Sequence, residues 1–209
     1  MATISRMTSE ERRAAILQAA VRLFAERGFR GTTTRALAEA VGVTEPVLYE
    51  HFKSKRELYW AIIDAKSRDG MARGSALLKP YAHAGDDRAF LTRLAGFVLD
   101  CHSEHSCEYA RLLLYAALEE PELGAVFHER QKEGRELLAR YVERRIREGA
   151  FRPLDPMVAA GIFLGMVIHQ GLWSLLFHDP LATTRREQVI ASTVDIFLNG
   201  IANARSSAQ

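Results

Sequence analysis

The sequence predicts an all-α protein of about nine helices, with a small three-helix N-terminal domain (residues 1–53) followed by a larger helical domain (residues 54–209). Three observations predict this fold. Apolar residues recur at the three- and four-residue spacing of amphipathic helices along most of the chain. Several of these stretches begin with a Ser or Thr that is followed three residues later by Glu, which is a helix-capping pattern. No stretch alternates apolar and polar residues as a strand would.

The composition is that of a globular protein. Of the 209 residues, 48% are hydrophobic and 26% are charged. The net charge of +2 is too small to indicate a nucleic-acid partner by itself, although basic residues slightly outnumber acidic ones in the first third of the chain. Only two cysteines are present and no secretory leader is evident, so we expect a cytoplasmic protein without disulfides.

The first helix is predicted from a capping box. Thr8 and Glu11 have the spacing in which each side chain caps the other's backbone N–H. Gly28 is the expected end of the helix, because glycine adopts the left-handed conformation that terminates helices. The residues expected to be buried recur on one side, at Ile16, Ala20, Leu23 and Phe24.

Two short helices joined by a tight turn are predicted over residues 32–55, TTTRALAEAVGVTEPVLYEHFKSK. Thr33 or Thr34 can cap the first of them. Gly42 gives the backbone freedom that a sharp turn requires. The apolar residues of the first helix are Leu37, Ala38 and Val41.

The second short helix has an equally clear start. Thr44 is a favourable N-cap, and Pro46 lies in the first turn, where its missing N–H costs nothing. Leu48 and Phe52 lie four residues apart and face the first helix. This pattern predicts a helix-turn-helix whose exposed face enters a DNA major groove. The outward residues are Glu45, Pro46, Val47, Tyr49, Glu50 and His51.

The same stretch resembles the N-terminal domain of the TetR family of bacterial repressors. The resemblance is carried by the run Leu-Tyr-x-His-Phe-Lys-x-Lys, which begins at Leu48 and follows Gly42-Val43-Thr44, and by Phe24 and Gly28 in the preceding helix. It covers about residues 8–60. Beyond this stretch the family shares architecture rather than motifs.

The resemblance implies a set of DNA contacts. Thr34 would hold a phosphate, and Arg35 would contact a base through a bidentate pair of hydrogen bonds to guanine. Glu45, Pro46 and Val47 occupy base-contacting positions. Glu45 could accept a hydrogen bond from a cytosine amine. The expected DNA-binding residues are Thr34, Arg35, Thr44, Glu45, Pro46, Val47, Tyr49, His51 and Lys55, of which Tyr49, His51 and Lys55 would clamp the backbone.

Each assignment has an alternative that the residues leave open. Arg35 could be a solvated surface charge. Glu45 is repelled by DNA unless it finds a donor, and could instead interact with the positive N-terminus of its own helix. His51 could hydrogen-bond a neighbouring carbonyl group.

The larger domain is predicted to contain the remaining helices. Ser54 and Glu57 form a capping box for a connecting helix that extends to about Met71, and residues 74–87 are predicted to form a loop because they contain Gly74, Pro80 and Gly85. Further helices are predicted over residues 88–102, 109–119, 122–148 and 156–177, and from a capping box at Thr184 and Glu187 onward.

The last two helices are the predicted homodimer interface, over about residues 157–177 and 185–204. Gly161 and Gly165 lie four residues apart and allow a neighbouring helix to approach closely. Two helices from each subunit would form a four-helix bundle, as the resemblance implies. The alternative is that both lie within the core of one subunit. A membrane span is disfavoured for residues 157–177, which contain His169, Gln170 and Ser174.

An effector pocket is a further expectation for the larger domain. The polar groups of His169 and Gln170 need partners inside an apolar helix, and a ligand, a partner subunit or a backbone carbonyl would each provide one. Of these, we favour a structural role. The candidate lining residues are Phe97, Tyr109, Leu113, Phe127, Met166, His169, Gln170 and Trp173.

No metal site or cofactor is expected. Cys101, His102, His105 and Cys107 contain the right atoms for zinc, but their spacing matches no standard ligand pattern. A redox role for the two cysteines is disfavoured as well.

The predicted function is a ligand-responsive transcriptional repressor that binds a near-palindromic DNA operator as a homodimer and is released by a small-molecule effector. The alternative is an architectural or partner-controlled DNA-binding regulator without a small effector. A helical enzyme is disfavoured, because no nucleophile–base motif, phosphate loop or metal-ligand pair is evident.

Overall fold

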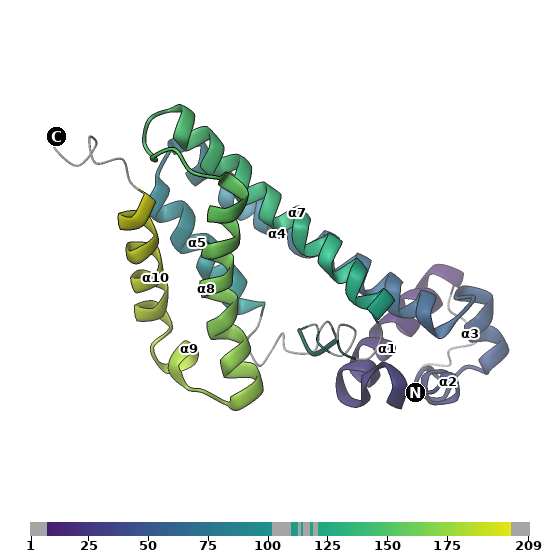
Figure 1. The fold of residues 1–209 in the computed structure, drawn as a ribbon. Helices are drawn as coiled ribbons and strands as arrows, with labels where there is room; N and C mark the ends of the chain where they lie inside the picture. The colour runs from purple at the N-terminus through teal and green to yellow at the C-terminus, as the bar shows by residue number, and fades with distance from the viewer. Residues whose placement is uncertain (1–7, 102–109, 113, 115–117, 119–120, 202–209) are drawn as a thin grey trace. The chain divides into compact units, whose positions relative to one another are not determined.

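A computed structural model describes residues 8–101, 110–112, 114, 118 and 121–201. All of the secondary-structure elements described are helices (Figure 1), which confirms the all-α prediction. They are α1 (Ser9–Gly31), α2 (Thr34–Val41), α3 (Glu45–His51), α4 (Lys55–Ala84), α5 (Asp87–Asp100), α7 (Pro121–Arg147), α8 (Pro156–Phe177), α9 (Leu181–Thr184) and α10 (Arg186–Ile201).

The chain divides into two compact units, each with its own core. The first comprises Met1–Asp69 and Glu108–His128, and the second comprises Gly70–Cys107 and Glu129–Gln209. The first core contains Phe24, Leu37, Leu48 and Leu58, and Leu112 joins it from far along the chain. Both α4 and α7 contribute residues to each unit.

The helix α4 extends beyond its predicted end. A loop was predicted over residues 74–87, but α4 continues to Ala84 and includes Pro80. Gly74 is explained by packing, because a Cβ atom there would lie 3.1 Å from the ring of Phe97. Leu78 is buried in the second core. Tertiary packing therefore outweighs the glycine and proline residues that suggested a loop.

The start of the last helix also differs from its prediction. Thr184 was predicted to cap this helix, but it ends the four-residue α9, and α10 begins at Arg186. The Thr184 hydroxyl instead donates to the Pro180 carbonyl over 2.9 Å, and Asp179 accepts from the Leu181 N–H at the start of α9. The helix predicted over residues 109–119 lies largely outside the described residues.

In the second unit, α5, α8 and α10 pack side by side (Figure 1). The helix α8 is long and apolar enough to cross a membrane by length and composition, a test that core helices of soluble proteins also pass. Only 28% of its most apolar window is buried within the chain, so much of an apolar helix faces outward.

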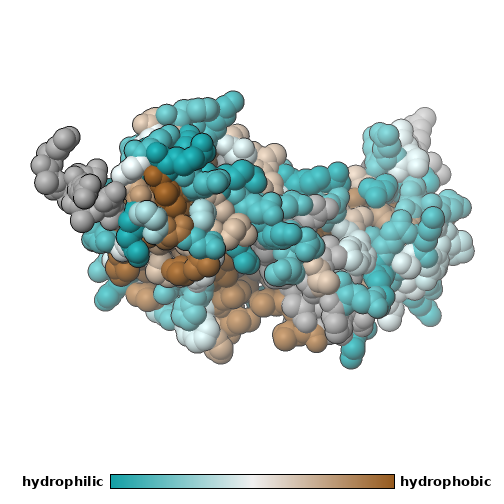
Figure 2. Space-filling view, turned by 45° about the horizontal axis from the view of Figure 1, so that its top comes forward, coloured by the Kyte–Doolittle hydropathy of each residue, from teal (hydrophilic) through white to brown (hydrophobic). Residues whose placement is uncertain are grey.

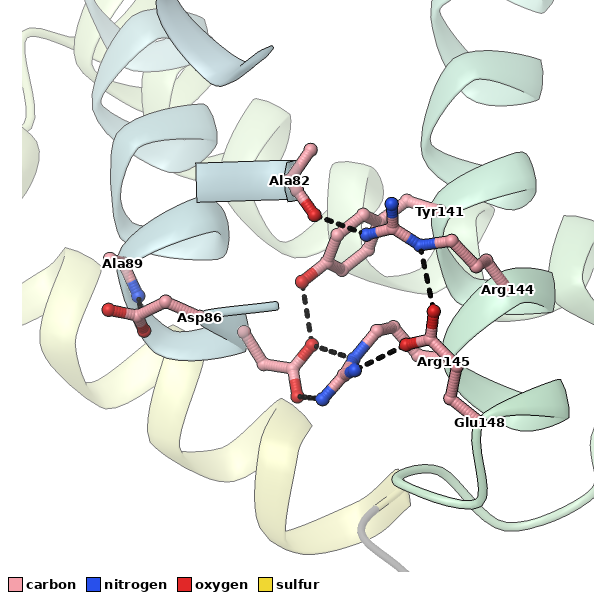
Figure 3. A network of polar contacts seen from close by, with 8 residues as sticks. Ala82, Asp86, Ala89, Tyr141, Arg144, Arg145 and Glu148 are labelled. Atoms are coloured by element: carbon pink, nitrogen blue, oxygen red, sulfur yellow. Dashed lines mark hydrogen bonds and ion pairs between the residues drawn. The ribbon is translucent and has the colours of Figure 1, made fainter. Parts of the chain in front are cut away.

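A polar network joins the ends of α4, α5 and α7 in this unit (Figure 3). Asp87 receives two hydrogen bonds from Arg145, at 2.8 and 2.9 Å, and a third from the Tyr141 hydroxyl at 2.6 Å. Arg144 donates to the carbonyl of Ala82 near the end of α4. Burial, and next the bond to Asp87, raise the pKa of Tyr141 well above its ordinary value, so the hydroxyl stays a donor.

Candidate nucleic-acid interface

The helix-turn-helix rests on an aromatic cluster in the first unit. The ring of Tyr59 meets those of Phe24 and Phe29 edge-on, with centroids 4.8 and 5.3 Å away. Tyr59 is fully buried, and its hydroxyl donates to the carbonyl of Leu112. This cluster fixes α1 against α4 and forms a rigid base for the two short helices.

The helices α2 and α3 begin and end close to the residues predicted from their caps and apolar spacing. Thr33, rather than Thr34, is the N-cap of α2, and its hydroxyl accepts from the Ala36 N–H at 3.1 Å. Gly42 has φ = 72° and ends α2 in the left-handed conformation. Thr44 occupies the N-cap position of α3 without a side-chain capping bond. The inward residues are buried, namely Leu37, Ala38, Val41, Leu48 and Phe52.

The outward face of α3 presents the residues expected to meet DNA. Tyr49 is 46% exposed and Pro46 is exposed, while Glu45 and Val47 are half-buried. His51 is also half-buried, and no described residue hydrogen-bonds its Nε2 atom. The apolar and aromatic side chains of this face suit contact with base edges and sugars in the groove, and Glu50 adds an exposed carboxylate beside them.

Two contacts join the expected DNA-binding residues of α2 and α3 to other side chains. The Thr34 hydroxyl donates to the Glu45 carboxylate at 2.6 Å and so links the first turns of the two helices. Arg35 donates to Glu39 at 2.9 Å, and this hydrogen bond raises the pKa of Arg35. Both members of the Arg35–Glu39 pair are well exposed, so the pair can open at small cost.

Lys55, the first residue of α4, contacts the backbone that precedes α2. Its ammonium group donates to the carbonyls of Phe29 and Thr32, at 2.8 and 2.9 Å, and lies 4.3 Å from the centroid of the Phe29 ring. These partners are 23 and 26 residues away, so no local sequence pattern predicts them. The Arg35–Glu39 contact, by contrast, has the four-residue spacing of a helical ion pair and could have been predicted.

The candidate effector-contacting residues whose side chains the structure describes lie on α5 and α8. Phe97 on α5 is half-buried, and so are Met166 and Gln170 on α8. His169 and Trp173 are exposed on α8, and their rings stack with centroids 4.4 Å apart. The side chain of Phe127 is not described, and Tyr109 and Leu113 lie outside the described residues. A groove of about 580 Å³ in the first unit is lined by other residues, among them Leu17, Val21, Ile62 and Lys66.

The cysteine and histidine run is only partly described. Cys101 lies at the end of α5, where burial raises the pKa of its thiol, so the thiol stays protonated. His102, His105 and Cys107 lie outside the described residues. The described part of the chain holds no group of three or more residues that could bind a metal ion.

Two family models match the chain. Residues 16–62 match the bacterial regulatory proteins of the tetR family, and residues 89–200 match the C-terminal domain of AefR-like transcriptional repressors. The second match alone covers more than half of the chain. The chain belongs to the TetR family. It is therefore a transcriptional regulator of the DNA-binding, helix-turn-helix type, and not an enzyme.

Individual relatives agree with this assignment. The chain is 42% identical to the transcriptional activator FasR of Mycolicibacterium smegmatis over 59 residues, which cover 28% of this chain and only 27% of FasR. It is 30% identical to the transcriptional repressor KstR2 of Mycobacterium tuberculosis over 150 residues, 68% of this chain and 70% of KstR2.

A solved structure extends the similarity to most of the chain. The structure of AibR in complex with isovaleryl coenzyme A and operator DNA covers 88% of this chain and 97% of AibR, with a TM-score of 0.65 and 27% identity.

Proposed function

We propose that this TetR-family regulator is a ligand-responsive repressor that binds a near-palindromic operator as a homodimer in the cytoplasm. The observation that carries the proposal is that the chain has both an exposed face on α3 and an exposed apolar stripe on α8. One copy of α3 makes too few contacts for a specific site, so two copies are needed.

The α8 stripe supports the homodimer. Val158 is 58% exposed, Ile162 is 55% exposed and Trp173 is 44% exposed. These residues recur at helical spacing along one side of α8, and Phe177 continues the stripe. Figure 2 shows exposed apolar residues in brown among the teal polar residues on one face of the molecule. An apolar stripe of this length on a soluble protein indicates a protein partner, and Ile196 on α10, 66% exposed, adds to it.

The α3 face supports the operator contacts. Pro46 and Val47 would pack on thymine methyl groups, and the exposed Tyr49 would contact the backbone, as the family resemblance implies. Glu45 has one oxygen held by Thr34, and its other oxygen is the candidate acceptor for a cytosine amine. His51 and Thr44 complete the proposed contacts from α3.

Release by a small effector is the second half of the proposal. The AibR structure contains isovaleryl coenzyme A as well as operator DNA, which supports a binding site for an acyl thioester in this fold. An effector acts only through its different affinity for the two states of the dimer. The alternative is a regulator that is controlled by a partner protein, without a small effector.

Selection of binding sequences from a random duplex library with the purified full-length protein tests the operator half. We expect a near-palindrome whose half-sites are about 10 base pairs apart or a multiple of that spacing. A single unpaired half-site, or no enrichment at low salt, would contradict the proposal. Release of the selected duplex by acyl thioesters or other small molecules, compared with release by a host-cell protein fraction, then separates effector control from partner control.

A further inference from the structure

We propose that Phe97 is a positioning residue for operator binding, because its ring packs on the bare backbone of α4 at Gly74 and so sets the position of the helix that follows α3 in the chain. This inference rests on the proposal that two copies of α3 bind one operator. It names the contact through which the second unit controls the separation of those two copies.

Gly74 lies where the ring of Phe97 comes close to the backbone of α4. A Cβ atom at Gly74 would lie 3.1 Å from one ring carbon of Phe97 and 3.4 Å from a second. Carbon atoms in favourable contact lie about 3.5–4.0 Å apart, so a side chain at Gly74 would displace the ring or the helix. Gly70, one turn earlier on α4, differs, because no neighbouring atom of the described residues lies within 4 Å of its Cβ position.

Phe97 belongs to the part of α5 that also holds α10. The carbonyl of Gly96, the preceding residue, accepts a hydrogen bond from Arg186 at 3.1 Å, and the Asp100 carboxylate accepts another from the same guanidinium at 2.7 Å. Arg186 is the first residue of α10. Two adjacent residues of α5 therefore contact different helices, α10 through Gly96 and α4 through Phe97. Because α10 belongs to the proposed homodimer interface, α5 connects that interface with α4.

The C-terminal end of α4 is held by α7. The carbonyl of Ala82 accepts a hydrogen bond from Arg144 (Figure 3). Measured along the helix, Gly74 lies about 12 Å from Ala82, and Lys55, the first residue of α4, lies about 40 Å from it. When α4 turns about this held end, a displacement of about 1 Å at Gly74 becomes about 3 Å at Lys55.

A displacement of this size disturbs a complex in which both subunits bind one duplex. Because both subunits shift, the separation of the two α3 helices changes by up to about 6 Å, against about 34–36 Å between successive major grooves on one face of DNA. The packing of α2 and α3 within the first unit is unaffected, so each α3 still fits its own half-site. An effector that displaced the ring of Phe97 would act in the same way.

Four variants of the full-length protein test the contact. Gly74→Val adds two methyl groups beyond the Cβ atom, on the side where the ring of Phe97 lies. Gly70→Val is the matched control, since it adds the same side chain to the same helix at a position with room for a Cβ atom. Phe97→Ala removes the ring. The double variant, Gly74→Val with Phe97→Ala, gives the valine the space that the ring occupied.

Titrations with the full operator and with a duplex that contains one half-site separate altered spacing from damage to the helix-turn-helix. They are made where every variant is folded and assembled like the wild type by sedimentation velocity. We expect Gly74→Val to bind the full operator at least about tenfold more weakly, and the half-site duplex within about twofold of the wild type. Addition of Phe97→Ala should recover at least about fivefold, and Gly70→Val should bind both duplexes like the wild type.

Three outcomes of these titrations would overturn the proposal. The first is wild-type operator affinity in Gly74→Val. The second is an equal loss of affinity for the full operator and the half-site duplex, which would place the defect within the helix-turn-helix. The third is a double variant whose loss is the sum of the two separate losses, because a contact between the two side chains requires the losses to be non-additive.

Thermal unfolding followed by circular dichroism tests the contact without DNA. We expect Gly74→Val to lower the thermal midpoint by about 3 °C or more relative to Gly70→Val, because the added methyl groups overpack the contact with Phe97. The double variant should lose less than the two single variants together. Equal midpoints for Gly74→Val and Gly70→Val would show that the ring does not restrain α4, and would also overturn the proposal.

Failure of the proposed function would be distinct from failure of this inference. A wild-type protein that binds no operator would contradict the operator proposal, and the thermal comparison would still decide whether Phe97 restrains α4 at Gly74. A lowered midpoint in Gly74→Val together with unchanged operator affinity would show that the contact exists without positioning α3, and would overturn this inference alone.

Discussion

At the scale of single residues, charge and burial separate the expected DNA contacts into two groups. Pro46 and Tyr49 are exposed and ready for contact, whereas Thr34 and Lys55 already bond to other parts of the first unit. Arg35 lies between these cases, since its partner Glu39 is on the same exposed helix face. Exposed ion pairs of this spacing contribute only about 0.3–0.5 kcal/mol, so DNA can displace Glu39.

Replacement of Arg35 should therefore change selectivity. We expect Arg35→Ala to reduce discrimination at one base pair per half-site by about 1–3 kcal/mol, because a bidentate contact to guanine is lost. Glu39→Ala is the control, and it should leave discrimination unchanged while strengthening binding slightly. Competition titrations with single-base operator variants provide the measurement. Unaltered base preference in Arg35→Ala would contradict a base contact by this residue.

At the scale of secondary-structure elements, the second unit is held at one end by Asp87 at the start of α5. Its carboxylate accepts hydrogen bonds from Arg145 and Tyr141 on α7. Arg144, on the same helix, donates a hydrogen bond to the carbonyl of Ala82 on α4. The side chains of Asp87 and Arg145 are only 18% and 16% exposed. If the charge of Asp87 is removed, the charge of Arg145 remains largely buried without an opposite charge beside it, which costs free energy.

Asp87→Asn should therefore destabilise the protein. We expect the free energy of unfolding to fall by about 2–3 kcal/mol, which lowers the thermal midpoint by about 4–10 °C. Asp195→Asn is the matched control, because Asp195 forms an exposed ion pair with Arg88 and should change the midpoint by about 2 °C or less. Thermal unfolding followed by circular dichroism measures both. Equal shifts in the two variants would show that the Asp87 network adds no more than a surface ion pair.

At the scale of the whole molecule, the exposed apolar stripe of α8 bears on whether the protein acts as a monomer or as a homodimer. Burial of this stripe between two subunits would remove several large apolar side chains from water and would place two copies of α3 on one duplex. The network at Asp87 and the stripe on α8 both belong to the second unit, so that unit combines a rigid framework with the proposed subunit contact.

Ile162→Asp should separate the subunits. We expect a dimer in the wild type and a monomer in the variant, because a carboxylate cannot be buried without a partner. Operator affinity should then fall by about 100-fold or more, since the second half-site no longer binds intramolecularly. Sedimentation velocity measures the assembly state. The matched control is Leu77→Asp, which changes another exposed apolar residue, 39% exposed, that lies on α4, and it should leave the assembly unchanged.

The sequence by itself determined the helix-turn-helix and the family. The capping box at Thr8 and Glu11, the left-handed Gly42 and the apolar spacing of α2 and α3 are local signals, and the structure contains each of them. Such signals involve residues a few positions apart, so they are visible in one dimension. The motif from Leu48 to Lys55 identified the family for the same reason.

Only the tertiary structure decided the partners of individual side chains. Lys55 meets carbonyls 23 and 26 residues away, Arg145 meets Asp87 across 58 residues, and Gly74 is needed because Phe97 packs against it. The same packing carries α4 through Pro80, where the sequence indicated a loop. Contacts between distant residues depend on how whole helices pack, and no local pattern records that arrangement.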